Sequence, residues 1–134
     1  MRRTLSTLCL ALGATIALLA GTAATATSPE SVTFVLDQAP SAAGTFVASG
    51  AVVDSGAHSM EIRFSGMSLH CIDTMTSTAG TIVVRLDCNL HTMNGEWRVV
   101  SGTGAYSELK ANGSLVMEFF PDGSFRETLT GKAH

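Results

Sequence analysis

The chain has 134 residues, of which 46% are hydrophobic and 14% are charged, and its formal net charge is −3. This length suits one domain with a modest core. A negative chain with no cluster of basic residues lacks the surface that binds phosphates, so we expect no nucleic-acid partner.

Residues 1–26 have the composition of a secretory signal peptide. Two arginines follow the first methionine, residues 5–20 are largely apolar, and Ala24–Ala26 fits the small-x-small pattern of a cleavage site. We therefore predict cleavage before Thr27 and a secreted single domain over 27–134 that does not insert into a membrane. A transmembrane anchor is the alternative, but the apolar run is shorter than the about 20 residues needed to cross a bilayer.

From Val32 onward, apolar residues recur at every second position, and glycine-rich or polar turns interrupt them. This pattern is typical of an all-β sandwich or barrel. Eight such segments follow one another through short loops, which favours an eight-stranded antiparallel up-and-down β-barrel that closes on itself. The alternation breaks between Ser101 and Ala111, where we expect a single helical turn that caps one end.

Tight turns predict which strand residues face each other, because inward side chains must lie opposite inward side chains. We expect three two-residue turns: Ser65-Gly66, which places His58 opposite Asp73; Ala79-Gly80, which places Cys71 opposite Cys88; and Asn94-Gly95, which places Thr92 opposite Trp97.

Two cysteines remain after the predicted cleavage. Cys71 and Cys88 are expected to form a disulfide, since an exported chain meets an oxidising compartment and the predicted turn brings them together. A reactive thiol pair is one alternative. Metal binding is another, but strand alternation places His70 and His91 on the opposite face from the cysteines, so no metal site is predicted.

The segment Gly95–Leu115 has a Gly-x-Trp strand, then Gly-Thr-Gly, an aromatic residue, a short helical turn and a small-residue strand. It resembles secreted bacterial proteins of the allene oxide cyclase and dirigent-like barrel group. Residues 43–50 are similar to the opening strand of that group. The resemblance implies an eight-stranded barrel with a central cavity, but no particular reaction.

The predicted interior is apolar and contains several methionines. An eight-stranded barrel is either filled by side chains or encloses one small ligand. We expect a small apolar molecule to bind there without cofactor or catalysis; a rigid envelope module with a filled interior is an alternative. The expected ligand-binding residues are Phe46, Met60, Ile62, Leu69, Met75, Leu86, Met117 and Glu127.

Three polar residues fall on the inward face: His58, Asp73 and Glu127. A carboxylate in a low-dielectric interior must be paired or protonated, and an imidazole that it holds can act as a general acid or base. The alternative function is therefore an isomerase or cyclase with His58 and Asp73 as catalytic residues. A bulge in the last strand would turn Glu127 outward. The sequence does not predict the oligomeric state.

Overall fold

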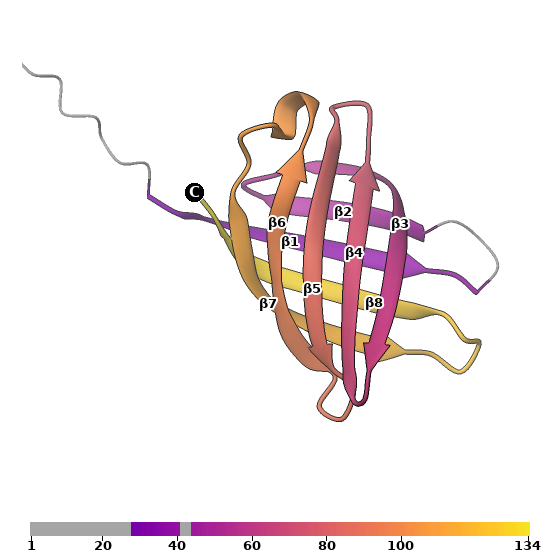
Figure 1. The fold of residues 1–134 in the computed structure, drawn as a ribbon. Helices are drawn as coiled ribbons and strands as arrows, with labels where there is room; N and C mark the ends of the chain where they lie inside the picture. The colour runs from indigo at the N-terminus through magenta and orange to yellow at the C-terminus, as the bar shows by residue number, and fades with distance from the viewer. Residues whose placement is uncertain (1–27, 41–43) are drawn as a thin grey trace, which may run out of the picture.

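A computed structural model describes residues 28–40 and 44–134. The predicted signal peptide and cleavage site lie outside these residues. Eight antiparallel strands form a closed barrel in chain order, which confirms the predicted fold class (Figure 1). The strands are β1 (Glu30–Gln38), β2 (Gly44–Gly50), β3 (Asp54–Ser65), β4 (Ser68–Thr76), β5 (Thr81–Asn89), β6 (Asn94–Gly102), β7 (Ala111–Phe119) and β8 (Phe125–Ala133).

The alternation in the sequence becomes alternation of burial along most strands, although residues 61–65 at the end of β3 are all exposed. In β4 and β5, for example, every second residue is buried. Side chains fill the interior: Phe34, Met75, Val84 and Leu129 have no exposed surface. Phe34 also packs edge-to-face on Trp97, with 5.5 Å between the ring centroids. The centre of the barrel is therefore a packed core.

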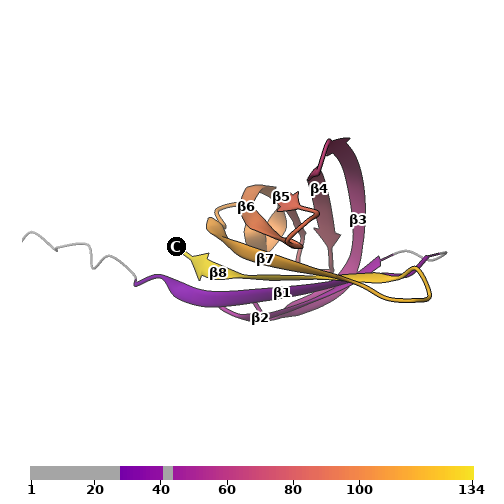
Figure 2. The same ribbon diagram turned by 90° about the horizontal axis from the view of Figure 1, so that it is seen from below.

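The strands form two layers that cross steeply, with β3 to β6 in one and β1, β2, β7 and β8 in the other (Figures 1 and 2). The first part of β3, up to His58, pairs with β2, whereas Ser59–Ser65 pair with β4 on the other side. Among the described residues, the pairing of β3 with β2 thus ends at His58.

The opposite end is closed by a short 3₁₀ turn, Gly104–Tyr106, where the helical turn was predicted. The hydroxyl groups of Tyr106 and Ser77 both donate to Asp54, which ties the turn to the β4–β5 loop and the start of β3. The described residues contain no helix that is long and apolar enough to cross a membrane.

The predicted position of the β3–β4 turn is wrong, because the two-residue loop lies one residue later in the chain than predicted. Ser65 lies opposite Ser68, so Gly66 and Met67 form the loop. Gly66 has a φ of +59°, and a type II′ hairpin places glycine first in the two-residue loop rather than second. The strand pairs consequently move by two residues.

The other two predicted turns are also wrong. The β4–β5 loop spans four residues, 77–80, and the Ser77 hydroxyl accepts a hydrogen bond from the Ala79 amide within it. The β5–β6 loop spans 90–93 because the Asn89 side chain accepts bonds from the amides of His91 and Thr92. Asn94-Gly95 therefore begins β6 instead of forming the turn.

The corrected register also separates the two cysteines. Cys71 lies opposite Leu86 and Cys88 opposite Leu69, and both cysteines are buried free thiols. Diagonal neighbours on paired strands are about 7–8 Å apart, which exceeds the usual span of a disulfide. The predicted disulfide is thus contradicted. Burial raises the pKa of both thiols, so they are neutral and unreactive.

For the protein that begins at Thr27, we expect thiol titration to detect two free thiols, Cys71 and Cys88, after denaturation without reductant, and none in the folded protein, because both are buried. Ellman's reagent with and without guanidinium measures this. Absence of thiols in the denatured protein would instead indicate a disulfide and a β4–β5 register different from the one described.

Candidate functional site

The predicted catalytic residues are not paired. His58 lies opposite Met75, and Asp73 lies opposite Met60, so the predicted His58–Asp73 pairing is wrong by two residues. The cause is the position of the β3–β4 turn. Both side chains do point inward and are buried, as the alternation predicted. His58 and Asp73 therefore have separate environments and separate chemical properties.

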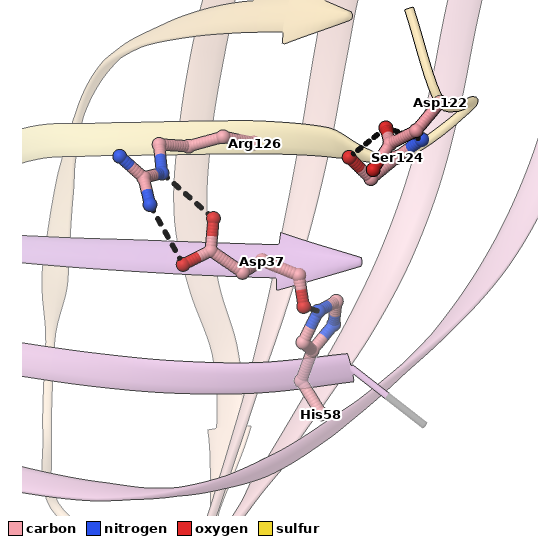
Figure 3. Close-up of polar contacts among 5 residues, drawn as sticks. All are labelled: Asp37, His58, Asp122, Ser124 and Arg126. Atoms are coloured by element: carbon pink, nitrogen blue, oxygen red, sulfur yellow. Dashed lines mark hydrogen bonds and ion pairs between the residues drawn. The ribbon is translucent and has the colours of Figure 1, made fainter. Parts of the chain in front are cut away.

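His58 lies at the point where β3 leaves β2, and it is 4% exposed. Its Nε2 is 3.2 Å from the main-chain oxygen of Asp37 (Figure 3). Because a carbonyl oxygen only accepts, Nε2 carries the hydrogen, and a neutral ring then has its lone pair on Nδ1. Burial lowers the pKa of His58, with the Asp37 carbonyl opposing part of this effect. The ring is thus neutral near pH 7, and the buried Nδ1 has no partner among the described residues.

Two further contacts fix the His58 ring. Arg126 donates from Nε and Nη2 to the two carboxylate oxygens of Asp37, at 2.7 and 3.0 Å, which joins β8 to β1 beside the ring (Figure 3). On the other side, Gly44 lies directly opposite His58, and a Cβ at position 44 would be 2.1 Å from Nε2. The ring therefore occupies the space that a side chain at position 44 would need.

A pocket of about 420 Å³ opens beside His58. We call it the mouth. Its size falls within the range of small-molecule sites. Its lining combines apolar side chains with a few polar ones from four strands: Gln38, Gly44, His58, Ser59, Met60, Ile62 and Phe125.

The surface around the mouth is unusually apolar. Ile62 and Phe64 on β3 are 43% and 70% exposed, and Phe119 on β7 is 58% exposed. Phe119 contacts Phe125, with 5.6 Å between the ring centroids. Exposed apolar groups gathered at one end of a barrel are typical of a binding surface.

A larger groove of about 630 Å³ lies on the outer face of β5 to β7, but it is lined mainly by charged groups such as Arg85 and Asp87. Asp87 already accepts hydrogen bonds from Arg85 and His70. Since Arg85 and Asp87 already pair with each other in contact with solvent, the mouth is the better candidate site.

Asp73 and Glu127 form a carboxyl pair inside the barrel. Neither has exposed surface, and neither bonds to any other described residue, but each is within hydrogen-bonding reach of the other. Two carboxylates have no hydrogen to share, so the pair is satisfied when it holds a proton. Burial raises the pKa of both groups, and the nearby Asp73 charge raises that of Glu127 further.

This geometry limits the chemistry available. The buried carboxyl pair does not orient His58, so the arrangement of base and orienting acid that an isomerase would need is absent among these residues. The described residues also contain no group of three or more His, Cys, Asp or Glu side chains that could hold a metal ion. What the mouth offers is an apolar surface beside His58, whose Nδ1 acceptor is buried and has no partner among the described residues.

The predicted ligand-binding residues divide into two groups. Phe46, Leu69, Met75, Leu86, Met117 and Glu127 are buried in the packed core. Met60 and Ile62 line the mouth. The sequence reasoning did not assign Gln38, Gly44 or Phe125 to the site. Phe125 lies two residues before Glu127 on the same strand, so the alternation of side chains could have placed it on the inward face. Nothing in the local sequence distinguishes Gly44 from a turn glycine.

The carboxyl pair makes stability depend on pH. A group whose pKa is raised by folding stabilises the fold below its unfolded pKa, about 4 for a carboxyl, and loses that contribution as pH rises through the folded value. We expect Glu127→Gln to be more stable than the native protein at pH 8 by about 1–3 kcal/mol and nearly equal at pH 4, because the amide cannot ionise.

Urea unfolding at pH 4, 6 and 8 measures this effect. Glu118→Gln is the matched control, since Glu118 is exposed on the outer face of the neighbouring strand β7. A Glu127→Gln variant that loses stability equally at all three pH values would show that the pair carries no shared proton.

Comparison of the chain with protein-family models, with curated proteins and with solved structures gave no match. The fold and the mouth therefore have to be interpreted from their own geometry. The resemblance to the allene oxide cyclase and dirigent-like group stays a prediction from the motifs in residues 43–50 and 95–115.

Proposed function

We propose that this protein binds a small, largely apolar molecule at the mouth, and that it acts as a binding protein rather than an enzyme. The observation that carries the proposal is the mouth itself, where Met60, Ile62 and Phe125 surround a buried neutral imidazole. This combination of an apolar wall with one fixed polar group is typical of small-molecule sites.

The unsatisfied Nδ1 of His58 suggests the kind of ligand. An acceptor buried without a partner costs free energy that a donor on the ligand would recover. The Asp37 carbonyl and the close contact with Gly44 hold the ring in one orientation, so the acceptor direction is fixed before binding. A ligand with an apolar body and one hydroxyl or amide N–H would satisfy this acceptor after a side chain of the wall moves aside, because Nδ1 itself is buried.

The packed core favours the mouth over the barrel centre. Phe34, Met75 and Leu129 have no exposed surface, so a ligand at the centre would require the core to rearrange. Met60 is half-buried between the two regions and is flexible, which makes it the side chain best placed to adapt to a ligand.

We also propose that the protein is exported and works outside the cell. The composition of residues 1–26 supports this.

Nile red, a neutral apolar dye, tests the mouth. We expect the native protein to enhance its fluorescence and Phe125→Asp to weaken its binding by about tenfold or more, because a charge in the apolar wall must stay hydrated. Val116→Asp is the matched control: Val116 is equally apolar and 49% exposed, but it does not line the mouth. Equal loss in both variants, or no binding to the native protein, would contradict the proposal. Thermal melting verifies that each variant is folded.

Export is tested separately by expression of the full chain in a secreting host. We expect the secreted protein to begin at Thr27, as measured by N-terminal sequencing and intact mass. Retention of residues 1–26 in a membrane fraction would support an anchor instead.

A further inference from the structure

The second half of β3 has a strand edge without a partner among residues 28–40 and 44–134. Between Ser59 and Ser65, β3 pairs with β4 on one side, and its pairing with β2 on the other side has ended at His58. No strand in segments 28–40 and 44–134 pairs with this other side, and β3 is the last of the upright strands in Figure 1. We call Ser59–Ser65 the free edge of β3. Such edges are templates for a strand from another chain.

The free edge is also exposed and apolar on one face. Met60, Ile62 and Phe64 alternate along it on the inward face, and the last two are among the most exposed apolar residues of the described chain. An added strand would thus cover apolar side chains as well as pair unpaired main-chain groups.

The sequence of the free edge, Ser-Met-Glu-Ile-Arg-Phe-Ser, is complementary to itself. With two copies antiparallel and Ile62 at the centre, Glu61 lies opposite Arg63 of the partner subunit. Two-fold symmetry repeats this ion pair, and Met60 lies opposite Phe64 of the partner subunit. Apolar groups thus face apolar groups, and each charge faces its opposite.

The charges also select this register. A shift by two residues, which would keep the apolar face inward, centres the pairing on Glu61 or on Arg63 and places like charges opposite each other. A shift by one residue would move the apolar side chains to the wrong face. Neither Glu61 nor Arg63 forms an ion pair within the described residues, and the cross-strand neighbour of Arg63, His70, already contacts Asp87. Both charges are therefore available to a partner.

We propose that two copies of this protein form a two-fold dimer through antiparallel pairing of the free edge of β3. The pairing joins the layers of β3 to β6 from both barrels into one continuous sheet and covers Phe64 and Ile62, so the interface borders the mouth that Ile62 also lines. The inference does not rest on ligand binding at the mouth, because it follows from the unpaired edge and the charge pattern.

Charge reversal tests the dimer. By sedimentation equilibrium, we expect the purified protein to dimerise, and Arg63→Glu or Glu61→Arg to raise the dimer dissociation constant by about tenfold or more through like-charge repulsion. The double variant Glu61→Arg with Arg63→Glu exchanges the two charges and should restore the native dissociation constant. Arg98→Glu, on the outer face of β6 away from the edge, should have no effect.

Three results would overturn this inference: a native protein that stays monomeric at millimolar concentration, single variants that dimerise as well as the native protein, or a double variant as weak as the single ones. Far-UV circular dichroism verifies folding, which should be preserved because both side chains are exposed. Nile red binding is measured in the same samples, so a failed dimer and a failed ligand site are distinguishable.

Discussion

Closure of the barrel depends on strict alternation of side chains, since each strand must place every second residue in one shared interior. The interior is narrow, so inward groups from strands far apart in the sequence contact each other across it. Phe34 of β1 packs on Trp97 of β6, and Asp73 of β4 meets Glu127 of β8. The same constraint therefore produces both the apolar core and its one acidic contact.

The carboxyl pair is the least favourable feature of this core. Two carboxyl groups without exposed surface can coexist when they share a proton, so the interior is most stable when that proton is retained. Burial raises the pKa of the Cys71 and Cys88 thiols, and the nearby Glu127 raises it further, so both thiols stay neutral. The centre of the barrel is thus acidic in composition, and a shared proton reduces the charge of the carboxyl pair from two negative charges to one; no lysine or arginine is buried among the described residues.

The alternation of inward and outward side chains could be predicted from the sequence, whereas the pairing register of neighbouring strands could not. All three hairpins differ from their predicted turns, but next to each turn the strand pairs shift by an even number of residues, so inward residues stay inward up to the irregularity of β5 at Val83–Val84. That is why the burial of His58, Asp73 and Glu127 was predicted correctly while the His58–Asp73 pairing and the disulfide were not. The turns are decided by side-chain caps, such as the Asn89 bonds to the following amides, which a glycine pattern does not reveal. The Asp73–Glu127 contact could not be predicted from the sequence either, because it depends on which strands face each other across the interior.

The mouth and the free edge of β3 have one structural origin. Where β3 parts from β2 after His58, the barrel wall opens, which exposes the inward side chains of Met60 and Ile62 and leaves the strand edge unpaired. Gly44, the last described partner of β3 on this side, is also the residue that leaves room for the His58 ring. A barrel that paired fully along β3 would bury these apolar residues and have neither a pocket nor an edge at this place. The local loss of strand pairing is therefore the feature that allows an otherwise filled barrel to interact with other molecules.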